Sequence, residues 1–167
     1  DFQKGDSMNI FYLDHNVEKC AEYHNNRHCV KMILEYAQLL STAHRLIDGE
    51  DCDDTVYKAT HKNHPSAIWA RENAENYNWL YSLFEALCNE YEYRYDKTHL
   101  SWTKLGEALK SPPKNIPRGK FYPPTPAMPD VCKLDNSLDS YRNYYITKKK
   151  HLFGWKDRLI PEWWVDC

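Results

Sequence analysis

The clearest pattern of apolar and polar positions in this chain runs from residue 28 to residue 47. The stretch reads HCVKMILEYAQLLSTAHRLI, contains neither Gly nor Pro, and is long enough for about five helical turns. At about 100° per residue, its apolar side chains fall on two flanks, one carrying Val30, Ile33, Ala37, Leu40 and Ile47 and the other carrying Met32, Tyr36, Leu39, Ala43 and Leu46. A helix with two apolar flanks is expected to be buried on both. We therefore predict that residues 28–47 form the central and most buried helix.

A narrow polar lane remains between these flanks. It consists of His28, Lys31, Glu35, Gln38, Thr42 and Arg45. Polar groups on a buried helix need hydrogen-bond partners or a solvated cleft, so the lane predicts a site on the central helix. The alternative is a solvated face with an ordinary i,i+4 ion pair between Lys31 and Glu35, although His, Gln and Thr are not typical solubilising residues.

The rest of the pattern predicts further helices joined by extended connections. The helices are expected at about residues 17–24, 68–91, 100–109 and 137–151, the second of them interrupted near residues 73–76. Residues 10–13 form a short apolar run, which is either a small strand or an extended lead-in. The segment from 111 to 130 contains seven prolines, so we expect an extended connection that packs over the helices.

These elements predict an all-α fold class. We expect one compact domain over residues 8–167, built around the central helix and closed by a Trp-rich C-terminus. Residues 1–7 (DFQKGDS) are expected to be a leader or an expression-derived extension, because the run from Met8 reads like a natural start. No internal repeat is present.

Composition and charge narrow the possible partners. A net charge of −2 over 167 residues gives no global field that attracts nucleic acid or a membrane. No apolar run approaches 18 residues and no signal peptide is visible, so no membrane partner and a cytoplasmic location are expected. None of the six cysteines has a CxxC spacing, which favours reduced thiols. The aromatic share of 14% suits either a core or stacking on bases.

The lane offers one candidate chemistry. Glu35 is within reach of the amine of Lys31, the imidazole of His28 and the guanidinium of Arg45, with Gln38 one turn further on. A carboxylate beside cations stays ionised, while burial opposes ionisation. Such a balance suits general acid–base work or the stabilisation of a developing cation.

The histidines and the C-terminal cations offer two further candidate sites, one for a metal and one for DNA. His24, His28, His61 and His64 with Glu35 or Asp14 could hold a metal, but their spacing is not a known ligand motif, and we expect no metal and no cofactor. Lys148, Lys149, Lys150 and Trp155 could contact phosphates and bases. The alternative is that the tryptophans close the core and the lysines are a solvated helix end.

Several of these residues resemble those of a known family. The spacing His28-x6-Glu35, with Tyr36 following, resembles the active helix of the phage pyrimidine-dimer DNA glycosylases. The segment from His61 to Pro65 (HKNHP), followed by a long helix, resembles a segment of their bacterial relatives. The His-Pro and Trp-Trp landmarks are also similar to those of an uncharacterised phage family of helical proteins.

The resemblance implies a compact helical, base-excising enzyme that acts on DNA. Glu35 would then take the position of the catalytic carboxylate, and His28 that of a histidine one helix face earlier. Those glycosylases use the amine of the residue after the initiator Met as the nucleophile. Here Met8 precedes Asn9, which is too large for ready removal of Met. We therefore expect another amine, and Lys31, one turn before Glu35, is the best candidate.

The hypothesis is a phage-type enzyme that excises or modifies a DNA base in the cytoplasm of an infected host cell. Its expected catalytic residues are Glu35, His28 and Lys31, and its expected DNA contacts are Gln38, Arg45, His61, Asn63, His64, Arg71, Lys148, Lys149, Lys150 and Trp155. We also expect His28, Glu35 and a residue of the 61–64 segment to line one pocket. One alternative is a non-catalytic factor that docks on a host or viral protein through a Trp-rich surface. Another is a histidine-based metal-dependent hydrolase.

Overall fold

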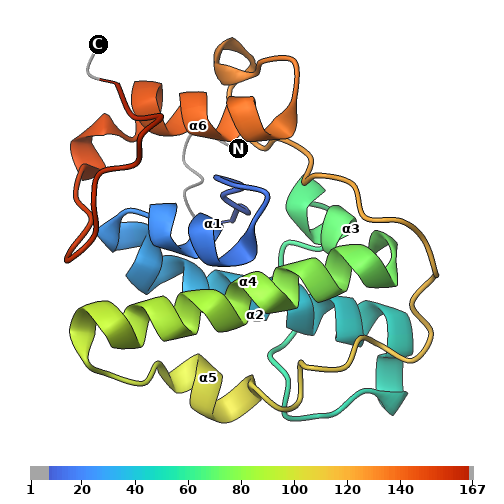
Figure 1. The fold of residues 1–167 in the computed structure, drawn as a ribbon. Helices are drawn as coiled ribbons and strands as arrows, with labels where there is room; N and C mark the ends of the chain where they lie inside the picture. The colour runs from blue at the N-terminus through green and yellow to red at the C-terminus, as the bar shows by residue number, and fades with distance from the viewer. Residues whose placement is uncertain (1–7, 166–167) are drawn as a thin grey trace.

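The computed structural model describes residues 8–165, and its regular structure there is entirely helical (Figure 1). The helices are α1 (Val17–Tyr23), α2 (Asn26–Asp48), α3 (Pro65–Glu72), α4 (Ala74–Tyr95), α5 (Leu100–Leu105) and α6 (Ser137–Lys148), with short 3-10 turns at Gly49–Asp51, Asp130–Cys132 and Lys150–Leu152. The predicted all-α class is confirmed. Residues 10–13 are an extended lead-in rather than a strand. The expected leader, residues 1–7, lies outside the described residues.

The two long helices α2 and α4 pack against each other and organise the domain. α4 also packs against α1 and α3, and α6 lies across the top of the view in Figure 1, above α1 and the lead-in segment. The Pro-rich connection runs as an extended strap along the side that carries α3. No helix within residues 8–165 is long and apolar enough to cross a membrane.

Burial of α2 follows the predicted pattern on both flanks. Its fully enclosed apolar residues come from both sets: Met32, Ile33, Tyr36, Ala37, Leu39, Leu40 and Ala43. Val30 and Leu46, one from each predicted flank, are instead exposed, and so is Leu34. Their exposure corrects the expectation that Val30 and Leu46 belong to buried flanks.

Local side chains set the helix boundaries. The predicted interruption near residue 73 is a break between two helices, where Asn73 ends α3 and accepts a hydrogen bond from the backbone N–H of Asn76 to cap α4. His64 caps α3 in the same way, because its Nδ1 accepts from the N–H of Ser66 at 3.0 Å. A capping Nδ1 must be unprotonated, so this helix start needs a neutral imidazole.

The C-terminal segment, residues 149–165, folds back over α1 and α6. The indole N–H of Trp155 donates to the carbonyl of Tyr23 at 2.8 Å. Trp164 lies against Trp155, and Trp163 lies against Tyr23 and Tyr145. The tryptophans therefore close the core rather than form an exposed docking surface.

A buried ionic network fixes this segment to the helices. Glu90 on α4 accepts hydrogen bonds from Arg94 at 2.8 Å and from Arg158 at 3.0 and 2.9 Å. Arg94 also donates to the carbonyls of His24 and Glu22, at the turn between α1 and α2. The network joins α4, that turn and the C-terminal segment.

Candidate active site

The polar lane of α2 is covered by different parts of the chain at its two ends. At one end, Nδ1 of His28 lies 2.7 Å from the hydroxyl of Tyr145 on α6. At the other, Thr42 exchanges hydrogen bonds with the backbone of Thr60, at 3.3 and 3.1 Å. Glu35 is seven residues from each end, or about 10 Å along the helix axis. It lies midway between α6 and the turn of residues 60–64, and only 6% of it is exposed.

The lead-in segment, residues 8–13, is anchored to Tyr36, the residue that follows Glu35 on α2. The backbone N–H of Phe11 donates to the hydroxyl of Tyr36 at 3.1 Å. Asn9 donates from its side chain to the carbonyl of Ala127 at 2.8 Å and accepts from the hydroxyl of Tyr141 at 2.6 Å. The segment is therefore held between α2 on one side and α6 with the Pro-rich strap on the other.

The proton positions around Tyr36 follow from its partners. Nδ1 of His24 lies 2.7 Å from the carbonyl of Cys20, which only accepts, so this nitrogen carries the proton. Burial lowers the pKa of His24 to about 4, which leaves Nε2 unprotonated at neutral pH. The hydroxyl of Tyr36, 2.7 Å from Nε2, must then donate to it. Phe11, Tyr36, His24 and Cys20 form one directed chain of hydrogen bonds.

His28 lies inside the domain rather than in an open cleft. Its ring stacks on Phe11 with centroids 4.1 Å apart, and 1% of the residue is exposed. Burial lowers its pKa well below the usual value, and nearby positive charges, including those of Lys149 and Lys31, add to this effect. A neutral, enclosed His28 fixes the positions of Phe11 and Tyr145.

The 60–64 turn and His28 occupy opposite ends of the lane. Within the turn, Nδ1 of His61 bonds the hydroxyl of Thr60 at 2.8 Å, and Asn63 is exposed. Burial, followed by the charge of His61, lowers the pKa of His64 to about 4. His28 itself is enclosed by Phe11 and Tyr145, and a pocket shared by His28, Glu35 and this turn stays a prediction. No group of three possible metal ligands occurs within residues 8–165.

Lys31 is partly exposed on the lane, one turn before Glu35. Met32 on one side of it is buried, but Val30 on the other side is 42% exposed. Of the two apolar flanks predicted for this helix, only one therefore encloses Lys31. Gln38, one turn after Glu35, is also partly exposed.

The structure gives two of the expected DNA contacts clear packing roles. The guanidinium of Arg45 donates to the carbonyls of Tyr57, Asp54 and Val56 and so holds the loop after α2. Trp155 is buried, with its N–H bonded to Tyr23 as described above. The role of Trp155 is the one that the alternative for the tryptophans predicted. The role of Arg45 was missed because its carbonyl partners lie in a loop without a motif.

The other expected contacts differ in their exposure. Lys148 and Lys150 are exposed at the end of α6, whereas Lys149 is buried, with its ammonium 5.0 Å from the centre of the Tyr144 ring. Arg71 on α3 is partly exposed. Its Nη1 is buried and has no hydrogen-bond partner among the described residues.

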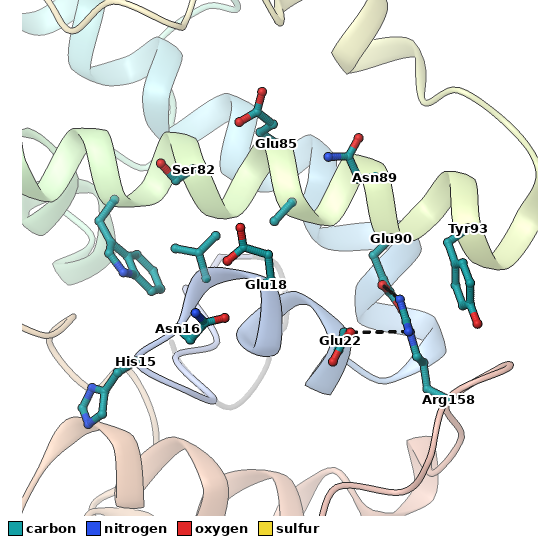
Figure 2. A pocket seen from close by; sticks show the side chains of 13 residues that line it. His15, Asn16, Glu18, Glu22, Ser82, Glu85, Asn89, Glu90, Tyr93 and Arg158 are labelled. Atoms are coloured by element: carbon teal, nitrogen blue, oxygen red, sulfur yellow. Dashed lines mark hydrogen bonds and ion pairs between the residues drawn. The ribbon is translucent and has the colours of Figure 1, made fainter.

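The most voluminous of the concavities described lies elsewhere, between α1 and α4. It has a volume of about 660 Å³ and is lined by four carboxylates, those of Glu18, Glu22, Glu85 and Glu90 (Figure 2). Arg158 pairs with Glu22 and Glu90 at one end of it. Carboxylates repel the phosphates of DNA, so this acidic groove does not suit a DNA backbone. No sequence motif marked it, because its residues come from two helices far apart in the chain.

Comparison with known proteins places these features in a family. Residues 8–103 match the pyrimidine dimer DNA glycosylase family. The match covers more than half of the chain and includes the lead-in segment, all of α2 with Glu35, the 60–64 turn and α4. No curated protein and no solved structure matches the chain. The chain belongs to the pyrimidine dimer DNA glycosylase family.

Proposed function

We propose that this protein is a DNA N-glycosylase in which Glu35 is the catalytic carboxylate. The observation that carries the proposal is the position of Glu35. It is a nearly enclosed acid at the middle of the polar lane, and the next residue, Tyr36, anchors the lead-in segment. Its spacing from His28 is also the spacing on which the resemblance to the family's active helix rests.

A carboxylate in this position suits glycosidic cleavage. Loss of the base builds positive charge on the sugar, and a fixed negative charge beside it stabilises the transition state. The interaction is stronger where water is excluded, and Glu35 is nearly excluded from solvent. The target nucleotide has to leave the base stack to reach such a site.

The proposal gives the neighbouring residues separate roles. Lys31, one turn before Glu35, is the candidate amine nucleophile. His28 is a positioning residue, because it acts through Phe11 and Tyr145. Gln38, His61, Asn63 and His64 lie along the lane or at the turn that covers its end. With Arg71, Lys148 and Lys150, they are the proposed DNA contacts.

The experiment compares Glu35→Gln with Glu75→Gln, a control at an exposed carboxylate on α4. The substrate is duplex DNA that carries a pyrimidine dimer, and both base release and binding are measured. We expect Glu35→Gln to release base about 100-fold more slowly or worse, the usual scale for loss of one preorganised electrostatic group. Its affinity for DNA should be unchanged or higher. Base release at the wild-type rate by Glu35→Gln would overturn the assignment.

A further inference from the structure

A second concavity lies where the first turns of α2 meet the end of α4. It has a volume of about 410 Å³ and is lined by Asn26, Arg27, Val30 and Lys31 of α2 and by Tyr95, the last residue of α4. We call it the Tyr95 pocket. Two cations and two apolar side chains line it, and no carboxylate does. Its charge is opposite to that of the acidic groove between α1 and α4.

The frame of the Tyr95 pocket is fixed by hydrogen bonds to Asn26. The side-chain oxygen of Asn26 accepts from Arg94 at 3.2 Å and from the backbone N–H of Lys156 at 2.8 Å. The backbone N–H of Asn26 donates to the carbonyl of Gly154 at 2.9 Å. A Cβ at residue 154, where φ is +151°, would lie 3.1 Å from the side chain of Asn26. The start of α2 is thus held by the end of α4 and by the C-terminal segment, and the pocket is already formed without a ligand.

The apolar part of the pocket continues towards Glu35. Val30 and Leu34, one turn apart on α2, are each 42% exposed although most of the helix is buried. An exposed apolar edge beside cations is typical of a surface that receives a ligand with a flat apolar part and a negative charge. A nucleotide has both properties, because its base stacks on aromatic rings and its phosphate pairs with cations.

We propose that the Tyr95 pocket is a nucleotide subsite for the DNA strand that flanks the reacting nucleotide. The base lies against Tyr95 and Val30, and the phosphate lies beside Arg27. Arg27 and Lys31 precede Glu35 by eight and four residues, which is about 6–12 Å along the helix. At about 3.4 Å per nucleotide of duplex, the bound nucleotide is about two to four steps from the one at Glu35. This inference rests on the proposed glycosylase function.

The first test measures DNA affinity as a function of salt. The ligand is duplex DNA with a non-cleavable abasic analogue at the target position. We expect Arg27→Gln to bind about tenfold more weakly and to lower the slope of log K against log salt by about one, the effect of one lost phosphate contact. Lys104→Gln, at an exposed lysine on α5, is the matched charge control and should change neither quantity. Wild-type affinity and slope for Arg27→Gln would overturn the phosphate contact and with it the subsite.

The second test locates the base. 2-Aminopurine is placed at successive positions beside the abasic analogue, and its fluorescence is measured with and without protein. We expect one position, two to four steps away, to be quenched by the wild type and by Tyr95→Phe but not by Tyr95→Leu. Tyr95→Leu retains apolar bulk, and circular dichroism checks that it folds. If no position responds, or if Tyr95→Leu quenches as the wild type does, the subsite is wrong.

These tests separate the subsite from the catalytic assignment, because they measure binding alone. If the Arg27 and Tyr95 variants bind as the wild type does while Glu35→Gln stops base release, the subsite fails and the glycosylase stands. If those variants lose binding as expected while Glu35→Gln releases base normally, the subsite stands and the role of Glu35 fails. A wild-type protein that binds no DNA overturns both.

Discussion

The hydroxyl of Tyr36 donates a hydrogen bond to Nε2 of His24 over 2.7 Å, and the same oxygen accepts from the backbone N–H of Phe11 over 3.1 Å. Tyr36 directly follows Glu35 on α2. One buried hydroxyl therefore sets the register between the helix that carries the candidate catalytic acid and the lead-in segment beside it.

Tyr36→Phe removes this hydroxyl and leaves two buried polar groups without a partner, the N–H of Phe11 and Nε2 of His24. Each unsatisfied group costs about 1–3 kcal/mol, so we expect the free energy of unfolding to fall by about 2 kcal/mol or more. Urea denaturation measures this fall. Tyr23→Phe is the control, because the hydroxyl of Tyr23 has no hydrogen bond within residues 8–165. Equal stability of the two variants would contradict the role of Tyr36.

Stability is expected to fall as the solution becomes mildly acidic. Burial lowers the folded-state pKa of His24 to about 4 from an ordinary value of 6.5, so the unfolded chain binds the proton first. The stabilisation is therefore complete above pH 6.5 and is lost progressively as the pH falls to 4. Over this window one such histidine accounts for about 3 kcal/mol. His64, whose pKa is also lowered to about 4, acts in the same direction.

Urea denaturation at pH 7 and pH 5 checks this dependence. The pKa of Glu90 is lowered from its ordinary value of 4.5, so this carboxylate affects the pH dependence of stability only below about pH 4.5. The change in stability between pH 5 and 6.5 therefore comes from the histidines. His24→Gln should be less stable at pH 7 but should lose less stability between the two pH values. His151→Gln, at an exposed histidine, should leave the dependence unchanged. A pH dependence that His24→Gln retains in full would contradict the assignment.

The exposed lysines at the end of α6 are expected to contact phosphates. Replacing Lys148 and Lys150 together by Gln should weaken DNA binding and lower the salt slope by about two, because each lost phosphate contact removes about 0.9. Lys149 is left in place, since it is buried against Tyr144 and its loss would disturb packing. Fluorescence anisotropy at several salt concentrations measures the slope. The double variant Lys104→Gln, Lys110→Gln removes the same charge elsewhere, and an identical effect from it would show that only net charge matters.

Borohydride trapping tests whether Lys31 supplies the nucleophile. In the expected reaction the amine attacks C1′, the bond to the base breaks, the base leaves with a proton, and the opened sugar forms an imine with the lysine. Borohydride reduces this imine to a stable amine, so a covalent protein–DNA adduct accumulates in the wild type and is lost in Lys31→Ala. Lys104→Ala is the control. A persistent adduct in Lys31→Ala would exclude this lysine, and base release without any adduct would indicate a water molecule positioned by Glu35.

The sequence alone determined the features that depend on neighbours along the chain. The two apolar flanks of α2 follow from helical periodicity, and the break at Asn73 follows from a residue that caps a helix better than it continues one. The Pro-rich strap follows from backbone geometry that excludes regular structure. Glu35 was found as a candidate through its spacing from His28. All of these signals operate within a few helical turns.

Only the tertiary structure decided which of the polar residues remain accessible. His28 is enclosed by Phe11 and by Tyr145, which is 117 residues away in the chain. The indole N–H of Trp155 is hydrogen-bonded to the carbonyl of Tyr23, 132 residues away. Val30 is exposed because the part of α4 beside it ends at Tyr95 and leaves a pocket. The periodicity of one helix shows which side chains share a face, but the partner that covers a face comes from distant segments, whose arrangement depends on packing of the whole domain.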